Sequence, residues 1–402
     1  MKDISIFTLT SGLHDEDSVK TISDSFLRSV LPGGFDFRGA DFASFGTHVL
    51  DLIFVRTGGS EGLFKSVLPE LLEKGERHFL LLTSGKSNSL AASLEILSYL
   101  RANGLGGEVI HGSETYTAGR ISALYEIASA RRKLRGMRLG VIGAPSDWLI
   151  ASHADPEAVR SKLGIELVDI PMEEVIEKYG PAEAEEAPDE PMAACVRSAY
   201  PGATKIYNAL KSVISAHALD GFTIRCFDLL TAVENTGCLA LSRLNAEGIP
   251  AGCEGDVPAL LSMAISSVVT GVSGFQANPS RIDVETGEIL FAHCTIPMNM
   301  VSSRVLDTHF ESGIGVGIRG HFDEGPVTVF KVSGDLKRVF AAEGTLVRNL
   351  SEQHLCRTQV VVRLSPQEAR YFLTDPIGNH HIIVPGHHGE ALGKTVNLPV
   401  EG

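Results

Sequence analysis

The first part of the chain alternates short, almost continuously apolar runs with segments whose apolar residues recur at helical spacing. Uninterrupted apolar runs are typical of parallel strands buried on both faces. The pattern predicts a doubly wound α/β domain over residues 1–136, with its ligand-binding edge at loops such as 83–89. The strands predicted here are 4–9, 51–57, 78–85 and 108–112, and residues 89–104 form a predicted helix that ends at a glycine.

A second α/β domain is predicted over residues 137–290, beginning with a strand at Arg138. The acidic, proline-bearing stretch 182–191 is interpreted as a solvated loop without chemistry of its own. Pro258 sits at the start of the last predicted helix, where its missing N–H costs little. The further elements predicted are strands 165–170 and 222–229, and helices 203–218, 237–248 and 257–271.

From about residue 291 to residue 402 the pattern changes to short strands separated by Gly, Pro, Ser and Asp. Turn residues at this regular spacing are typical of an antiparallel barrel or sandwich. The chain is therefore expected to contain two doubly wound, Rossmann- or flavodoxin-like domains followed by a C-terminal, antiparallel β-rich domain.

Composition narrows the class of protein. The formal charge of -14 argues against nucleic acid or an anionic membrane as the main partner, since both require clustered Lys and Arg. Six scattered cysteines without a CxxC pair are expected for reduced thiols in a cytoplasm. The N-terminus does not read as a signal peptide, and no apolar run reaches the about 18 residues of a membrane span. We therefore expect a soluble, cytoplasmic protein. The sequence contains neither the GxxxxGK[ST] nor the GxGxxG motif, which argues against nucleotide binding.

Four of the fourteen histidines lie within residues 380–388. His380 and His381 begin a predicted strand, so their side chains point to opposite faces and cannot both serve one site. One of them could be a satisfied core histidine, and His387 and His388 could be solvated beyond a Pro-Gly turn. By itself the cluster indicates either a metal or acid/base site or a structural role.

Other candidate side chains lie at strand ends. Asp256 directly precedes a predicted helix and reads as an ordinary N-cap. Glu254 lies beside an apolar strand, where a lone buried carboxylate needs a compensating cation. Asn278, at a strand exit, and His293, among apolar neighbours, are each more often structural. Together these residues could form a nitrogen and oxygen site for manganese or magnesium, and sparse cysteine argues against structural zinc.

The segments around these residues resemble a known family. AGCEGDVPALLSMAISSVVTG, GFQANPS, LFAHCTIP and GNHHIIVPGHHG are similar to the L-fucose isomerase and L-arabinose isomerase superfamily, most closely to its shorter L-fucose isomerase-like members. SGKSNSLAASLEILSYLR and GAPSDWLIAS extend the resemblance over most of the chain. It implies two α/β domains, a C-terminal barrel, and a manganese-dependent aldose–ketose isomerase acting on a monosaccharide in a cleft between them. It also implies a homo-oligomer, a trimer or hexamer, in which neighbouring subunits complete the cleft.

The resemblance assigns Glu254 as a catalytic metal carboxylate, and His293 and His380 as metal ligands. Isomerisation passes through an enediolate, which a divalent cation stabilises while a carboxylate, here Glu254, shuttles the proton. Asn278 stands where the family usually has a second acidic ligand and acid/base, and an amide cannot accept that proton. Asp256 and Asp375 are candidate substitutes.

Because Asn278 stands in place of the family's second acid, the sequence is also compatible with two other functions. An epimerase or lyase would use the same enediolate, and a non-catalytic sugar-binding protein would need only the cleft.

Overall fold

The computed structural model describes residues 3–397. The chain forms two compact units, one within residues 3–132 and the other over residues 133–397. The division of the chain into three domains remains a prediction.

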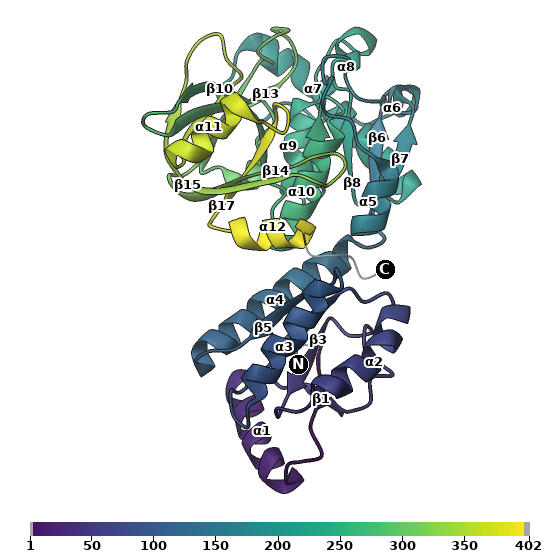
Figure 1. Cartoon of the computed structure of the whole chain (residues 1–402). Helices are drawn as coiled ribbons and strands as arrows, with labels where there is room; N and C mark the ends of the chain where they lie inside the picture. The colour runs from purple at the N-terminus through teal and green to yellow at the C-terminus, as the bar shows by residue number, and fades with distance from the viewer. Residues whose placement is uncertain (1–2, 398–402) are drawn as a thin grey trace. The chain divides into compact units, whose positions relative to one another are not determined.

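The N-terminal unit is built on a five-stranded parallel sheet of order β2-β1-β3-β4-β5 (Figure 1). Helices α1 and α4 pack on one face, and α2 and α3 pack on the other. Its strands are β1 (Ile4–Leu9), β2 (Asp36–Gly39), β3 (Leu50–Val55), β4 (His78–Leu82) and β5 (Gly106–Ile110). Its helices are α1 (Glu16–Val30), α2 (Glu61–Glu73), α3 (Ser89–Ala102) and α4 (Glu114–Leu134).

The second unit contains a parallel sheet of order β7-β6-β8-β9. Its strands are β6 (Arg138–Ile142), β7 (Glu166–Ile170), β8 (Gly221–Ile224) and β9 (Ala251–Cys253). Its helices are α5 (Pro156–Leu163), α6 (Met172–Tyr179), α7 (Ala194–His217), α8 (Asp228–Ala232), α9 (Cys238–Ala246) and α10 (Val257–Thr270).

The same unit contains a closed antiparallel barrel of order β10-β11-β16-β15-β14-β17. Its strands are β10 (Phe275–Asp283), β11 (Glu288–His293), β14 (Gly325–Val332), β15 (Val339–Leu350), β16 (Thr358–Arg363) and β17 (His381–Pro385). Beside it lie the paired strands β12 (Ser303–Asp307) and β13 (Gly317–His321), the 3-10 turn Met298–Met300, and helices α11 (Pro366–Thr374) and α12 (Gly389–Asn397).

Helix α10 connects the sheet to the barrel (Figure 1). Its apolar residues share one core with β6 of the sheet and with β14 and β17 of the barrel. Leu260, Leu261 and Ile265 are fully buried in this core, which explains why the helix is apolar on all sides. The sheet and the barrel therefore share a core, which fixes the position of the turn that precedes α10.

The predicted fold class is confirmed: two parallel doubly wound sheets precede a closed antiparallel barrel. The predicted strand 222–229 was too long, because β8 ends at Ile224 and the next residues turn into α8. Arg225 makes that turn, since its guanidinium pairs with Asp147 and Asp228. Strand β2 was not predicted, because it is a short edge strand without an apolar run.

None of the helices within residues 3–397 combines the length and the apolar character needed to cross a membrane.

Candidate metal centre

Glu254 occupies a tight turn between β9 and α10. Its φ is 64°, and that of the following Gly255 is 70°, so two successive residues adopt the left-handed conformation. A side chain at Gly255 would collide with the backbone of Ala144. The backbone N–H of Ser146 donates to the carbonyl of Glu254 (3.0 Å), and that of Gly255 donates to Ile224 (3.0 Å). The turn is therefore fixed from both sides, and strain of this kind is typical of functional sites.

Gln276 fixes the end of β9 to the barrel. Its buried amide accepts from the N–H of Cys253 (2.8 Å) and donates to the carbonyl of the same residue (3.3 Å). Gln276 belongs to β10, so the residue directly before Glu254 is hydrogen-bonded to a barrel strand. This pair of bonds brings the sheet edge next to the barrel residues that carry the histidines.

Glu254, His293 and His380 converge at this junction. Their potential ligand atoms, a carboxylate oxygen and two imidazole nitrogens, all lie within 4.8 Å of one another. Glu254 Oε1 lies 3.4 Å from His380 Nε2 and 3.8 Å from His293 Nε2. Glu254 directly follows β9, His293 ends β11, and His380 directly precedes β17. The structure thus brings together three of the residues that the sequence singled out.

A hydrogen bond at Nδ1 orients the ring of each histidine. His380 Nδ1 lies 2.9 Å from Asp256 Oδ2, and His293 Nδ1 lies 2.9 Å from the hydroxyl of Thr295. A neutral imidazole that donates from Nδ1 presents the lone pair of Nε2, here toward Glu254. A metal-binding histidine whose other nitrogen is held by a carboxylate is a common arrangement in metalloproteins.

Asp256, the carboxylate that contacts His380 Nδ1, is neutralised by the positive charge of Lys331. Asp256 is fully buried, caps α10 by accepting from the N–H of Ala259 (2.8 Å), and lies 3.4 Å from Lys331 Nζ. Burial raises the pKa of Asp256, but Lys331 and His380 outweigh it and lower that pKa to about 2. Burial also lowers the pKa of Lys331, against the attraction of Asp256.

The electrostatics of the centre favour a cation. Burial raises the pKa of Glu254, yet His293 and His380 hold it well below its usual range. Burial lowers the pKa of His380, and Asp256 and Glu254 overcome this effect and raise it to about 9. Glu254 and Asp256 therefore favour positive charge at His380, and a divalent cation held between Glu254 and His380 would interact with the same groups.

The donor set fits a divalent metal ion. His380 Nε2 is completely buried and makes no hydrogen bond within the described residues, although it points at Glu254. An unsatisfied buried nitrogen is costly unless another partner is present. One carboxylate oxygen and two imidazole nitrogens suit manganese, iron, cobalt or zinc, with positions left for a substrate. The three residues can therefore hold a divalent metal ion.

The remaining predicted residues lie around this centre. Asn278 is half-buried in β10, where its amide oxygen accepts from Asn379 (3.1 Å), the residue before His380. It pairs in register with Ala292, the residue before His293. Its roles as ligand and catalytic group stay predictions, as does the catalytic role of Asp256. Asp375 is exposed and pairs with Arg338 (2.7 Å).

The paired histidines diverge as predicted. His381 Nδ1 bonds to the carbonyl of Asn379, and its ring packs against Tyr371 and Phe372, away from Glu254. Burial lowers the pKa of His381 to about 3, so it remains neutral. His387 is half-exposed and bonds to the carbonyl of Gly344.

An aromatic row beside Glu254, formed by Trp148, Phe227 and His309, was not predicted from the sequence. The indole N–H of Trp148 donates to Glu254 Oε2 (2.7 Å), and half of the Trp148 surface is exposed. The Trp148 ring meets Phe227 edge-on, with 5.0 Å between centroids, and Phe227 meets His309 in the same way at 5.7 Å. These residues belong to loops far apart in the chain, so periodicity could not connect them. The single tryptophan in a polar loop was the one available signal.

The chain is similar to proteins that share one name. No protein-family model matches the chain. It is similar to the sulfoquinovose isomerase of Clostridium sp. (strain MSTE9), 25% identical over 228 residues, which cover 52% of this chain and 48% of that protein. Sulfoquinovose isomerases of Priestia aryabhattai (25% over 301 residues, covering 66% and 64%) and Alkalicoccus urumqiensis (20% over 266 residues, covering 61% and 59%) are also similar. The chain thus spans less than two thirds of the length of each relative.

Proposed function

We propose that this protein is a metal-dependent aldose–ketose isomerase of a monosaccharide. The observation that carries the proposal is the convergence of Glu254, His293 and His380, whose ligand atoms lie within 4.8 Å. Similarity to proteins named as sugar isomerases supports the reaction class. Manganese is the proposed metal because the sequence resembles manganese-dependent isomerases.

The two oxygens of Glu254 have different surroundings. Oε1 faces the two histidines and is the ligand oxygen, whereas Oε2 accepts from the indole of Trp148. The metal, when bound, supplies Lewis-acid stabilisation of the negative charge that develops on the sugar oxygens. Glu254 remains the candidate proton shuttle through Oε2. A carboxylate whose pKa is held so low is a weak base, however, so a second group is needed for the proton.

His309 is our candidate for that second group. It is half-buried at the end of the aromatic row and is electrostatically coupled to Glu254 and His293. Burial, together with His293, lowers the pKa of His309 to about 4, so its ring is neutral near pH 7, and it remains a stronger base than Glu254, whose pKa is held lower still. His309→Gln should lower kcat more than it changes KM, since the ring acts on the reacting proton. A raised KM with unchanged kcat would indicate that His309 contributes only to sugar binding.

The test of the function uses purified full-length protein and two variants. Wild-type protein loaded with Mn2+ is expected to convert an aldose to its ketose in a panel of sulfoquinovose, L-fucose and L-arabinose. Glu254→Gln and His380→Ala should abolish both turnover and stoichiometric metal binding, measured by elemental analysis. His387→Ala, on the same segment but half-exposed, serves as the matched control. Metal binding that persists in both variants would refute the proposal.

Asn278 supports the alternative that the site is an epimerase or lyase on a sugar. Its amide cannot take the proton that an acid at this position would accept. Asn278→Asp should raise aldose–ketose turnover if the position limits isomerisation. If wild type and variant instead form the same epimer or cleavage product, the alternative is the correct function.

A further inference from the structure

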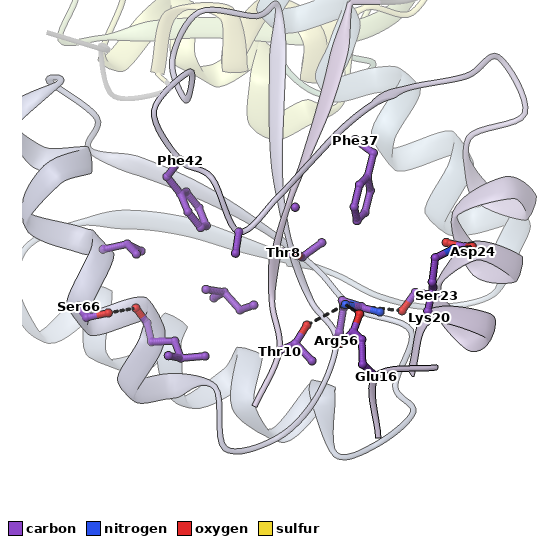
Figure 2. A pocket seen from close by; sticks show the side chains of 15 residues that line it. Thr8, Thr10, Glu16, Lys20, Ser23, Asp24, Phe37, Phe42, Arg56 and Ser66 are labelled. Atoms are coloured by element: carbon purple, nitrogen blue, oxygen red, sulfur yellow. Dashed lines mark hydrogen bonds and ion pairs between the residues drawn. The ribbon is translucent and has the colours of Figure 1, made fainter. Parts of the chain in front are cut away.

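The N-terminal unit contains a cavity of about 570 Å³ that shares no residue with the metal centre. It lies at the carboxyl ends of β1 and β3, between α1, α2 and the segment that follows β2 (Figure 2). The sheet order β2-β1-β3 makes this the place where the chain changes direction across the sheet. Ligands of doubly wound sheets bind at such switch points.

Arg56, the residue directly after β3, lies within this cavity (Figure 2). Its side chain is only 6% exposed. Nε donates to Ser23 (3.0 Å), and Nη1 donates to Thr10 (3.0 Å) and Glu16 (2.8 Å). No residue from 3 to 397 hydrogen-bonds to Nη2. Because a guanidinium carries five N–H groups, two remain on Nη2 for a ligand, on a side chain already held in place.

Among residues 3–397, no buried counter-charge faces the buried charge of Arg56. Its ionic partner in this part of the chain, Glu16, begins α1 and is 63% exposed, so solvent screens this pair. The other cation of the cavity, Lys20, is paired with Asp24 (2.6 Å). A carboxylate or phosphate could pair with the planar guanidinium more completely than Glu16 does, through two parallel hydrogen bonds.

One wall of the cavity is largely apolar. Phe37 exposes half of its surface, and Phe42 and Leu9 are buried in the wall. Leu63 and Val67 of α2 complete that wall. Such a wall suits a compact ring or hydrocarbon body. The carboxylates of Glu16 and Asp24 disfavour a ligand with several anionic groups.

We propose that this cavity binds a small organic anion with one oxyanion group, carboxylate or phosphate, on a compact apolar body. The oxyanion pairs with Arg56 and displaces the exposed carboxylate of Glu16, and the body lies against Phe37. The site is independent of the metal centre and of the isomerase proposal.

Isothermal titration calorimetry of the full-length protein in EDTA tests this binding with three probes. Benzoate and phenyl phosphate are the carboxylate and phosphate probes, and benzyl alcohol is the neutral analogue. We expect saturable binding of at least one anion and none of benzyl alcohol. Whichever anion binds identifies the oxyanion. Absence of binding by both, or equal binding of benzyl alcohol, overturns the proposal.

Variants with opposite expected effects locate the site. Glu16→Gln removes the competing carboxylate and should tighten binding of the anion. Arg56→Lys should weaken it about tenfold or more, because the remaining ammonium cannot form the paired bonds. Glu61→Gln, at the corresponding first position of α2 and outside the cavity, should leave affinity unchanged. Since Glu16 is exposed, its variant should fold even if Arg56→Lys does not. An affinity that Glu16→Gln fails to raise contradicts the proposal.

Discussion

His380 is buried between two carboxylates of different character. Asp256 is fully buried and neutralised by Lys331, so it orients the imidazole, whereas Glu254 is reached by solvent and by Trp148. The imidazole nitrogen that faces Glu254 has no hydrogen bond within residues 3–397. At the residue scale, the metal centre thus depends on Asp256 holding Nδ1 of His380, which leaves Nε2 available to a metal ion.

Replacing His380 by Ala should therefore abolish metal binding at the centre. We expect the affinity for Mn2+ to fall by more than about 100-fold. Loss of a group that only hydrogen-bonds to a metal ligand usually costs about 10- to 100-fold, and loss of the ligand itself should cost more. Equilibrium dialysis with elemental analysis measures this change. His387→Ala should retain wild-type affinity, and an equal loss in both variants would point to global unfolding instead.

Trp148 reports on the same centre, because it is the chain's one tryptophan and donates to Glu254. Mn2+ titrated into the wild-type protein should quench its fluorescence, and this response should disappear in Glu254→Gln. Trp148→Phe removes the donor to Oε2 and should lower turnover about tenfold, the usual effect of losing a hydrogen bond to a charged group. Fluorescence that is insensitive to Mn2+ in the wild type would place the metal elsewhere.

At the scale of elements, α10 and β14 are connected by a buried ion pair. Asp256 caps the first turn of α10, and Lys331 comes from β14. The side chains are 0% and 1% exposed, respectively. The pair therefore links the helix after the Glu254 turn to the barrel. The electrostatic role of Asp256 can be separated from its capping role, because asparagine also caps helices well.

Asp256→Asn should destabilise the protein by about 3–5 kcal/mol, because Lys331 would remain buried without a counter-charge. The double variant Asp256→Asn/Lys331→Met should recover most of this loss. Asp155→Asn, at the exposed N-cap of α5, is the matched control and should be nearly neutral. Chemical denaturation measures all three, and a double variant no more stable than the single one would refute the coupling.

A second link between elements lies on the barrel surface. Glu288 of β11 pairs with Arg348 of β15 (2.6 Å) and Arg363 of β16 (2.7 Å), which lower the pKa of Glu288 to about 2. Because the folded-state pKa lies below that of the unfolded chain, this stabilisation is complete above about pH 4.5 and is lost toward pH 2.

Glu288→Gln should therefore reduce stability at neutral pH and reduce the loss of stability between about pH 4.5 and pH 2. We expect a difference on the order of 1 kcal/mol, because the site is partly solvent-screened. Urea unfolding midpoints at several pH values measure it. Glu285→Gln in the preceding turn should keep the wild-type pH dependence, and parallel curves for wild type and Glu288→Gln would contradict the prediction.

At the scale of the whole molecule, the metal centre joins a parallel sheet to a barrel. Glu254 follows β9, whereas His293 ends β11 and His380 directly precedes β17. A cation held by all three would stabilise the folded state over the unfolded chain.

Metal removal should accordingly destabilise residues 133–397. At a free Mn2+ concentration of about 100 times Kd, bound metal should contribute about 2.7 kcal/mol, seen as a higher Tm than in EDTA. Calorimetry of wild type and Glu254→Gln with and without Mn2+ checks this. The variant should show no metal-dependent shift, and an equal shift in both proteins would exclude Glu254 as a ligand.

Sequence alone determined the class of the fold and many of its elements, because burial patterns and turn residues act locally. Continuous apolar runs identified the parallel strands, and the Asp256 cap marked the start of α10. Strand alternation also established that His380 and His381 point to opposite faces.

Only the tertiary structure decided what each polar residue contacts. His380, rather than His381, faces Glu254, Asp256 both caps a helix and neutralises Lys331, and Asp375 pairs with Arg338. These contacts join residues tens to hundreds of positions apart, so their formation depends on how the sheet and barrel pack. The cavity around Arg56 likewise arises from strand order, which no local pattern encodes.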